Sequence, residues 1–279
     1  MLTTSDKYFP SRDRPNGAKA RQPGQPPSPH SRRNRILAGL PKDALVSLAP
    51  YLEYVPLKRR QILHERNVPL AYAYFLEDGV ASLLARVAAR GFYEVGLLGC
   101  SDFVGLPLVL GTERTPHRCV MQTSGSAFRI SADHLDRALN EYPSVRTILL
   151  AYAQATMVET AQLAVCNSSH NLKQRLARCL LAIHDRLPGD EIPLTHQTLS
   201  RTLGVRRAGV TTAMGRLEEA GLLHRGRGHI MIANKAGVEA EACECYRTIR
   251  SEHQRLVWST NPVAPTRSVQ GGAAMLLAS

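Results

Sequence analysis

Short runs of β-forming residues, separated by turn signals, fill the chain from Leu52 to about Ile130. Examples are AYAYFLEDG, VASLLARVA, FYEVGLLG and SAFRIS. A spacing of roughly 8–12 residues is typical of an antiparallel sandwich or barrel and differs from the strand–helix alternation of a parallel sheet. A helix is predicted on either side, from LPKDALVSLAPYL before the runs and from SADHLDRALNEYP after them.

A longer helix is predicted from Pro143 to about Val165, a stretch that has Pro only at its first position and no Gly. Its apolar residues fall on two faces. One face carries Ile148, Ala151, Ala155, Val158 and Val165, and the other carries Leu149, Tyr152, Thr156 and Leu163. A helix that is apolar on more than one side must pack in two directions, or lie within a core. The two phasings fit about equally, so the pattern does not decide which face packs where.

A helix-turn-helix with a wing is predicted in the C-terminal third. NLKQRLARCLLAIHDRL has apolar residues at helical spacing and is followed by Pro188-Gly189. Thr195 is a candidate N-cap for the helix HQTLSRTL, Gly204 suits a tight turn, and a second helix is expected from about Arg206 to Ala220. Its apolar side consists of Val210, Met214 and Leu217, and LLHRGRGHIMIA reads as two strands of a wing.

The exposed side of this helix-turn-helix carries residues that suit DNA. The N-terminal half of the second helix is the part that enters the major groove, where Arg reads guanine and Thr contacts phosphate or a thymine methyl. A helix N-terminus and a basic wing suit the phosphate backbone. The predicted DNA-binding residues are therefore Thr195, His196, Gln197, Arg206, Arg207, Thr211, Thr212, Arg225 and Arg227. A winged helix used only for protein contacts is the alternative.

Charge supports an anionic partner. The 279 residues contain 35 Lys and Arg against 23 Asp and Glu, a formal net charge of +12. Residues 36–170 hold twelve of each sign, whereas residues 1–35 hold eight basic and two acidic residues and residues 171–254 hold thirteen and nine. The first 35 residues are rich in Pro and poor in apolar residues, which predicts a disordered basic tail, either a solvated leader or an arm that touches DNA. The stretch 251–279 is also expected to be an unstructured tail.

The sequence offers little evidence for a cofactor, a metal site or a catalytic site. Residues 1–99 contain no Cys, which argues against an iron–sulfur cluster in that segment, and no haem site is predicted. Cys100, Cys119, Cys166 and Cys179 are interpreted as small core residues, with a thiol switch as the alternative. Cys243 and Cys245, if they share one helix, point about 200° apart and cannot easily hold one ion. His64, His117 and His134 show no His-x-His spacing, so a roll-fold enzyme is not expected.

The order of these features resembles the cyclic-AMP receptor protein / fumarate-nitrate reductase regulator (Crp/Fnr) family. The resemblance rests on ILHERN, AYFLEDGVAS, FYEVGLLGCSDFVG, AFRISADHLDRAL and the helix-turn-helix, and covers roughly residues 36–250. It implies an α+β fold with an N-terminal antiparallel β-roll like a cyclic-nucleotide-binding jelly roll (36–142), a long dimerisation helix (143–170) and a winged helix-turn-helix (171–250). It also implies a homodimer on a pseudo-palindromic DNA site, with RNA polymerase as a candidate partner. The first residues, MLTTSDKYFPSRDRPNG, contain no apolar core of signal-peptide length, which predicts a cytoplasmic protein.

The cyclic-nucleotide pocket of that family is degenerate here. Its phosphate-binding cassette has a Gly-Glu pair followed by an Arg-Ser pair, whereas this chain has Gly105-Leu106 and, without a gap, Pro116-His117. A buried phosphate needs a charge-assisted donor, which Pro lacks. Arg114 or Arg118 aligns with the Arg position of the cassette only if a gap is introduced. The candidate ligand pocket consists of Gly105, Leu106, Arg114, His117 and Arg118. Cyclic AMP is not expected to bind in the usual way, and a small-molecule receptor without DNA output is the alternative.

Two further expectations complete the prediction. Arg207 matches a base-reading Arg of the family, but Ala208 replaces a frequent Glu and Thr212 a second Arg, so the familiar TGTGA-type half-site is not expected. No uncharged apolar run approaches the roughly 20 residues that span a bilayer, so no membrane is expected.

Overall fold

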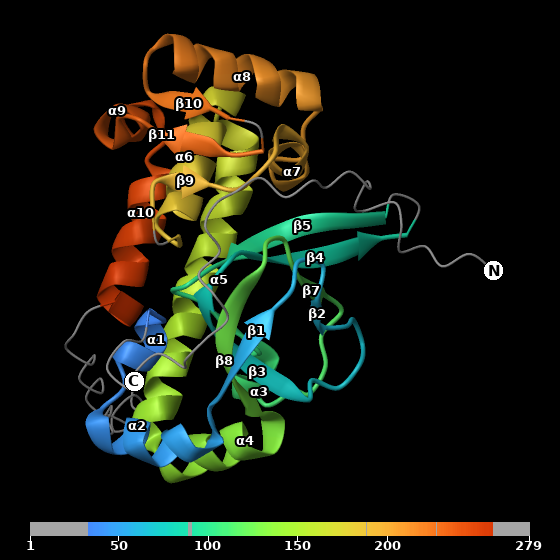
Figure 1. Ribbon diagram of the computed structural model, residues 1–279, viewed down its shortest axis with the longest axis vertical. Helices are drawn as coiled ribbons and strands as arrows, with labels where there is room; N and C mark the ends of the chain where they lie inside the picture. Colours follow the sequence, from blue (N-terminus) through green and yellow to red (C-terminus); the bar gives the residue numbers. More distant parts are fainter. Residues whose placement is uncertain (1–32, 89–90, 188, 227, 259–279) are drawn as a thin grey trace, which may run out of the picture.

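The structure is a computed structural model that describes residues 33–88, 91–187, 189–226 and 228–258. A β-roll at one end and a small helical domain at the other are joined by one long helix, α5 (Figure 1). The α+β prediction, with an antiparallel roll before a winged helix-turn-helix, is confirmed. Most of both predicted tails lies outside the described residues, namely 1–32 of the tail 1–35 and 259–279 of the tail 251–279.

Two four-stranded antiparallel sheets form the roll. The first has the order β1-β8-β3-β6, with β1 at Glu53–Leu57, β8 at Gly125–Ser131, β3 at Tyr72–Asp78 and β6 at Phe103–Val104. The second has the order β2-β7-β4-β5, with β2 at Ile62–His64, β7 at Arg118–Met121, β4 at Ala81–Val87 and β5 at Gly91–Leu98. Leu76, Val104 and Met121 lie in the core between the sheets, as inward positions of alternating strands should.

Short helices cover one end of the roll: α1 (Arg35–Ala38), α2 (Lys42–Leu48), the 3₁₀ turn η1 (Ala49–Tyr51), α3 (Leu106–Val109) and α4 (Ala132–Glu141). Ser131 caps α4 through a hydrogen bond from the backbone N–H of His134, which explains where that helix starts. Asn34 caps α1 in the same way, so residues just before the predicted boundary at 36 already belong to this part of the fold.

The long helix α5 runs from Pro143 to Ser169. Its residues Val145, Leu149, Tyr152 and Ala155 are buried against the roll, and Ile148 is partly buried there. Residues of both predicted apolar faces therefore contact the roll. By length and hydropathy α5 is the one described helix that meets the requirements for crossing a bilayer, with 22% of its most apolar window buried. In this fold it packs against the roll and α10 instead (Figure 1).

The C-terminal domain has its own core around α6 (Leu172–His184), α7 (His196–Thr202) and α8 (Arg207–Glu219). The wing strands are β10 (Leu223–Arg225) and β11 (Ile230–Ile232), and a third strand, β9 (Glu191–Ile192), pairs with β11. The helix α9 (Lys235–Glu241) follows. The predicted helix-turn-helix and wing are confirmed, whereas β9 was not predicted because two residues carry no periodic signal.

The chain after α9 corrects two expectations. GVEAEACECYRTIR is not one helix: α9 ends at Glu241, Ala242 is extended, and α10 begins at Cys245. Furthermore, α10 (Cys245–His253) and the π-helical turn η2 (Gln254–Trp258) cross the expected domain boundary at 250 and pack beside α5, and Val257 is buried with Ile36 and Leu37 of α1. The expectation of a tail from residue 251 failed because the few apolar residues there are used in long-range contacts.

Candidate nucleic-acid interface

A capped helix, a glycine turn and a second helix present the candidate interface. The Thr195 hydroxyl accepts a hydrogen bond of 3.1 Å from the N–H of Thr198 and so fixes the start of α7. Gly204 has φ +66°, a left-handed conformation that favours glycine, and it redirects the chain into α8. Val210, Met214 and Leu217 are fully buried in the domain core, as predicted. The opposite face of α8 is therefore turned outward.

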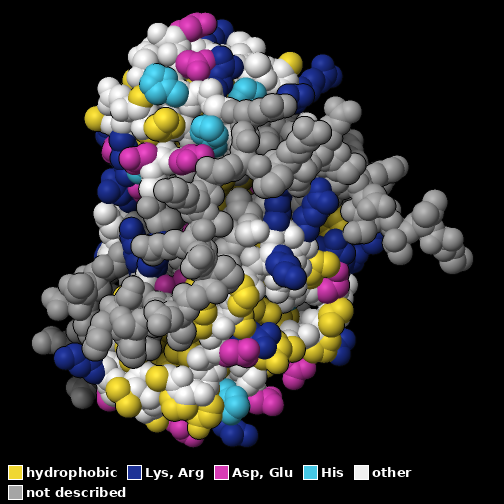
Figure 2. All heavy atoms as spheres, in the orientation of Figure 1, with side chains coloured by type: hydrophobic (Ala, Val, Ile, Leu, Met, Phe, Trp, Pro, Cys, Tyr) yellow, Lys and Arg dark blue, Asp and Glu magenta, His cyan; other side chains and the backbone are white. Residues whose placement is uncertain are grey.

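The outward face of α8 carries Arg206, Arg207, Thr211 and Thr212, all exposed. Figure 2 shows Lys and Arg side chains at the upper right edge of the molecule, where α8 begins in Figure 1. The hydroxyls of Thr211 and Thr212 donate to the carbonyls of Arg207 and Ala208, both at 3.1 Å. Because the hydroxyl protons of Thr211 and Thr212 already donate to helix carbonyls, a bound partner could contact these residues through their methyl groups and the lone pairs of their oxygens.

The start of α7 lies next to this face. His196 Nδ1 is 3.1 Å from Thr211 Oγ1, so the first helix and the second helix meet at the exposed surface. Burial, with Arg225 and Arg207 nearby, lowers the pKa of His196, which keeps its imidazole neutral near pH 7. Gln197 is exposed beside it. The structure thus brings these residues together with the outward face of α8.

The wing contributes one described arginine. Arg225 is exposed at the end of β10 and is tied to Glu218 of α8 by a salt bridge and by a hydrogen bond of 3.1 Å from its backbone N–H to Glu218 Oε1. This contact lowers the pKa of Glu218 and orients the guanidinium at the edge of α8. Arg227, the second predicted wing residue, lies outside the described residues.

The five residues of the candidate nucleotide pocket are spread over two segments. Gly105, with φ +128°, lies so close to β3 that a Cβ there would be 2.7 Å from Ala73 Cβ. Leu106 starts α3 and packs against the roll core. Arg114 is exposed, and the backbone N–H of His117 donates to Thr115 Oγ1 at 3.3 Å.

Arg118 already has partners within the roll. Its guanidinium forms a salt bridge of 2.6 Å with Glu65 and lies 4.5 Å from the ring centre of Phe92. Leu106 offers no carboxylate to a ribose, and Arg118 would have to leave Glu65 to reach a phosphate.

Sequence reasoning missed a buried ionic junction between the two domains. Arg186, which follows α6, donates to Asp102 of the roll at 2.9 Å and to Glu159 of α5 at 2.8 Å. His253 of α10 is 3.0 Å from the same Glu159 oxygen, and the Tyr152 hydroxyl donates to Asp102 at 3.2 Å. Burial alone would raise the pKa of Glu159, but the adjacent Arg186 lowers it to about 2. The partners of Arg186 lie 84 and 27 residues away, so no local pattern could reveal them.

A second junction joins the sheet to the helix-turn-helix. Glu94 of β5 is buried, accepts a hydrogen bond of 2.6 Å from Ser82, and is hydrogen-bonded to the Thr202 hydroxyl at the end of α7. Burial raises the pKa of Glu94 to about 7 despite these hydrogen bonds. A group of the roll that contacts the helix-turn-helix domain therefore has a pKa near neutral pH.

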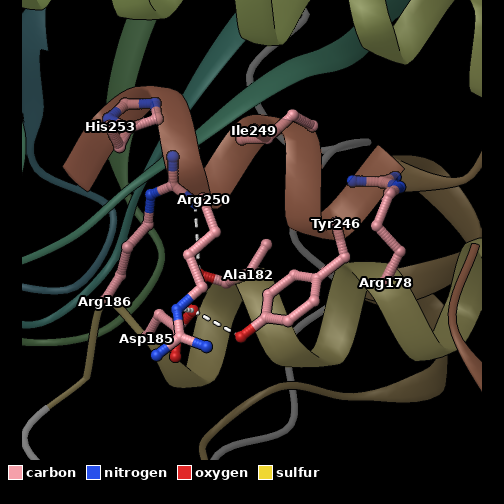
Figure 3. A pocket seen from close by; sticks show the side chains of 8 residues that line it. All are labelled: Arg178, Ala182, Asp185, Arg186, Tyr246, Ile249, Arg250 and His253. Atoms are coloured by element: carbon pink, nitrogen blue, oxygen red, sulfur yellow. Dashed lines mark hydrogen bonds and ion pairs between the residues drawn. The ribbon is translucent and has the colours of Figure 1, made fainter. Parts of the chain in front are cut away.

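A small cavity lies between α6 and α10 (Figure 3). Its lining residues are Arg178, Ala182, Asp185, Arg186, Tyr246, Ile249, Arg250 and His253. Its volume of about 10 Å³ corresponds to one water molecule, so it is too small for a nucleotide. The Tyr246 hydroxyl donates to Asp185 at 2.8 Å, which fastens α10 to the domain (Figure 3).

The break between α9 and α10 changes the interpretation of two cysteines. The expectation that Cys243 and Cys245 diverge assumed one continuous helix, and that geometry is wrong. Both thiols lie within 4.8 Å of the side chains of Cys166 and His170. The expectation that these cysteines are not metal ligands rested on the divergent geometry and therefore loses its support. Cys166 was interpreted as an isolated core residue, whereas it is buried with these two thiols. Cys119 and Cys179 lie in apolar cores as expected.

Comparisons with known proteins agree with this architecture. Residues 174–241 match the model of the Crp-like helix-turn-helix domain. No curated protein matches the sequence. The fold is similar to that of FixK2 from Bradyrhizobium japonicum, with a TM-score of 0.62 and 15% identity over 69% of this chain and 98% of FixK2.

Two further solved structures show the same fold. TTHB099, a CRP-family transcriptional regulator from Thermus thermophilus, has a TM-score of 0.56 and 15% identity over 67% of this chain and 96% of its own. The c-di-GMP responsive global regulator CLP from Xanthomonas campestris has a TM-score of 0.55 and 17% identity over 69% of this chain and 99% of its own.

Proposed function

We propose, from the premise that this chain has the Crp/Fnr regulator fold and a Crp-like helix-turn-helix domain, that it is a sequence-specific DNA-binding transcription regulator. The observation that carries the proposal is the outward face of α8. Arg206 and Arg207 are exposed at its N-terminal end, and neither forms an ion pair with another described residue. A free arginine at this position suits bidentate contact with guanine in the major groove.

The proposed base contacts centre on Arg207, with the methyl groups of Thr211 and Thr212 toward thymine. Thr195, His196 and Gln197 at the start of α7 would lie near the phosphate backbone, and Arg225 and Arg227 of the wing would contact the adjacent backbone or minor groove. Arg206, at the N-cap of α8, is the second candidate for base or phosphate contact.

We propose further that the protein acts as a homodimer through α5. The side of α5 away from the roll exposes a stripe at alternating three- and four-residue spacing, formed by Thr147, Leu150, Gln154, Met157, Ala161, Ala164 and Ser168. Leu150 is 42% and Met157 65% exposed in the single chain. This spacing is the heptad pattern of a coiled-coil seam, so two α5 helices would bury these residues against each other. Two α8 helices would then meet a pseudo-palindrome.

The sensor roll is proposed not to bind cyclic AMP in the usual way. Leu106 stands where the family uses a carboxylate, and Arg118 is paired with Glu65. The protein would then act constitutively or respond to another signal. The DNA partner makes the cytoplasm its proposed compartment.

The test is selection of bound DNA from a random pool by the purified protein, with and without cyclic AMP. A palindromic motif enriched equally in both conditions supports the proposal. Enrichment that requires cyclic AMP would show that the pocket is functional. If no motif emerges in either condition and the protein does not shift genomic fragments, direct DNA binding is wrong and the receptor without DNA output becomes the better hypothesis.

The dimer is tested separately by sedimentation of Met157→Lys. A charge in place of Met157, at the centre of this seam, should convert a dimer into a monomer without unfolding it, since Met157 is exposed in the single chain. The matched control is Thr160→Lys, an exposed position on the same helix outside the stripe. If both variants sediment as the wild type does, α5 is not the seam.

A further inference from the structure

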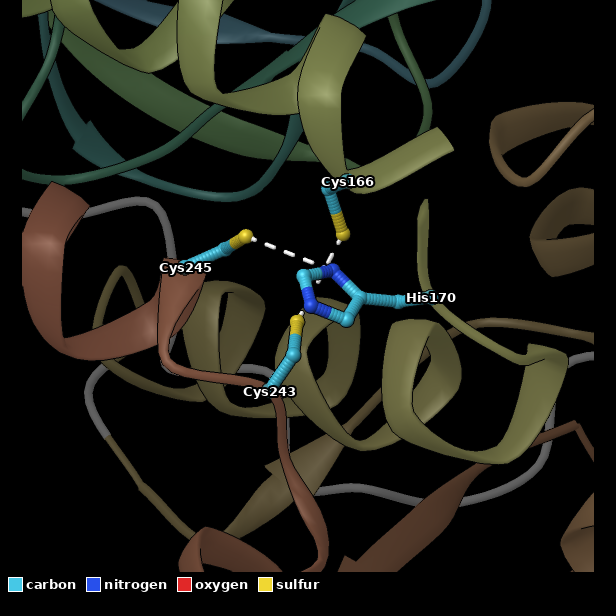
Figure 4. Close-up of side chains that lie close together, drawn as sticks. All are labelled: Cys166, His170, Cys243 and Cys245. Atoms are coloured by element: carbon cyan, nitrogen blue, oxygen red, sulfur yellow. Dashed lines mark hydrogen bonds between the residues drawn. The ribbon is translucent and has the colours of Figure 1, made fainter. Parts of the chain in front are cut away.

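Four potential metal ligands meet where the dimer helix ends and the DNA-binding domain begins. Cys166 lies in the last turn of α5, and His170 follows as its C-cap. Cys243 and Cys245 come from the break between α9 and α10, more than 70 residues later (Figure 4). One ligand atom from each of the four side chains lies within 4.8 Å of every other.

Two of the six distances between these atoms match the edges of a tetrahedron around one ion, and the other four are at most 4.8 Å. Cys166 Sγ is 3.5 Å from Cys243 Sγ, and Cys245 Sγ is 3.6 Å from His170 Nδ1 (Figure 4). A Zn–S bond of about 2.3 Å and a Zn–N bond of about 2.0–2.1 Å place tetrahedral ligands roughly 3.5–3.8 Å apart. In an iron–sulfur cluster the ligands are shared among several irons and must spread farther, so one ion fits better.

Groups around the four ligands orient them toward a common point. His170 Nε2 is 3.1 Å from Glu244 Oε1, which leaves Nδ1 free to face the thiols. A carboxylate on the second imidazole nitrogen is the usual support of a metal-binding histidine. The side-chain amide of Gln162 donates to Cys245 Sγ at 3.2 Å, a contact that stabilises a thiolate. A plain apolar core would require neither contact.

All six cysteines are buried, but these three are distinguished from the others because they gather in one place. Cys166, Cys243 and Cys245 are at most 3% exposed and form a cluster of their own, apart from the apolar cores that hold Cys119 and Cys179. A Cys166–Cys243 disulfide would need about 2.05 Å between the sulfurs and would leave Cys245 and His170 unexplained.

We propose that Cys166, His170, Cys243 and Cys245 bind one zinc ion in a closed, tetrahedral Cys₃His site. Four protein ligands leave no open position for a substrate, so the role is structural. The ion links the end of α5 to the break between α9 and α10. It thereby fixes the orientation of the DNA-binding domain relative to the proposed dimer helix. The site is independent of the proposed DNA contacts, because none of its ligands lies on α7, α8 or the wing.

The first test is the metal content of the full-length protein, purified without a histidine tag and under reducing conditions. We expect one zinc per chain by elemental analysis. Replacement by Co²⁺ should give the intense visible absorption of tetrahedral cobalt with thiolate charge-transfer bands. These measurements use the wild-type chain and do not depend on whether a variant folds.

Variants then assign the ligands. Cys245→Ser and His170→Ala should lose stoichiometric zinc, whereas the matched control Cys100→Ser should keep it, because buried Cys100 lies in the roll. Glu244→Gln removes only the support of His170, and because second-sphere partners are typically worth 10- to 100-fold in affinity, zinc binding should weaken by about 10-fold. Glu244 is exposed, so this variant should fold.

Three results would overturn the proposal. The first is wild-type protein that retains no metal and takes up neither zinc nor cobalt. The second is full zinc occupancy in both Cys245→Ser and His170→Ala. The third is iron with the absorption of an iron–sulfur cluster, or a Cys166–Cys243 disulfide identified by mass spectrometry in protein kept under reducing conditions.

Discussion

The outward face of α8 and the ionic junction beneath the same domain use arginine in opposite ways. Arg206 and Arg207 are exposed and project from one short segment. Arg186 is buried, its side chain only 8% exposed, and it joins Asp102 of the roll to Glu159 of α5. The exposed arginines are available to a partner, whereas the buried one holds two domains in one arrangement. Net charge therefore says little about function until burial is known.

The two regions also differ in what a substitution should change: contact with a partner on α8, and the arrangement of the domains at the junction. Substitutions on the outward face of α8 should leave the fold intact, because its residues are exposed. The junction, by contrast, connects the roll, α5 and α10, because Arg186 contacts Asp102 and Glu159 and His253 contacts Glu159. A movement of Asp102 would therefore reach the helix-turn-helix domain through Arg186. Substitutions in the two regions should therefore produce different kinds of defect.

The largest effect is expected from Arg186→Met. The substitution leaves the carboxylates of Asp102 and Glu159 buried without their cation, and breaking a buried ion pair in this way typically costs about 3–5 kcal/mol. Denaturant unfolding of the full chain should show a much lower midpoint. The control Arg247→Met removes an exposed arginine of α10 and should leave the midpoint nearly unchanged. Equal midpoints for both variants would mean that the junction does not hold the domains.

A pH-dependent effect is expected at the other junction. Because the pKa of Glu94 is raised from 4.5 to about 7 in the folded protein, its contribution to stability is complete below about pH 4.5 and is lost as pH rises through about 7. The full loss is on the order of 3 kcal/mol, at 1.36 kcal/mol per pKa unit.

Glu94→Gln tests this assignment, since an amide is neutral at every pH. The difference in unfolding free energy between wild type and variant should change between pH 4.5 and 7.5, with the wild type losing stability relative to Glu94→Gln as pH rises. The matched control Glu219→Gln, an exposed glutamate at the end of α8, should run parallel to the wild type. A constant difference for Glu94→Gln across this range would show that Glu94 is ionised throughout.

A smaller and more specific effect is expected from Arg207→Ala on α8. If Arg207 reads guanine, the variant should lose about 1–3 kcal/mol of discrimination at one position of the selected site. Its stability should not change, because Arg207 is exposed. Binding measured on the best site and on sites with that one base pair altered would reveal the change. Unchanged discrimination at every position would place the base contacts elsewhere on α8.

The same comparison shows what the sequence could predict. Thr195, Gly204 and the inward residues of α8 follow local rules of capping, turn formation and helical spacing, and the structure places them as predicted. The pairing of Arg186 with Asp102, and the gathering of Cys166 with Cys243, depend on the tertiary fold and have no local signature. Cys243 and Cys245 were misplaced because Ala-rich sequence has high helix propensity, which the extended Ala242 overrides.

The smallest effect is expected from Arg225→Ala on the wing. Arg225 is already paired with Glu218, so a phosphate would only share its guanidinium, and the loss of affinity should be below about 1 kcal/mol. Because phosphate contacts carry no sequence information, specific and random DNA should weaken alike. The slope of the logarithm of affinity against that of salt concentration should fall by about 0.9, the value for one phosphate contact. Arg247→Ala, distant in sequence from the wing, should keep the wild-type slope. A loss confined to the specific site would instead make Arg225 a base reader, and the exposed arginines would then extend base recognition from α8 to the wing.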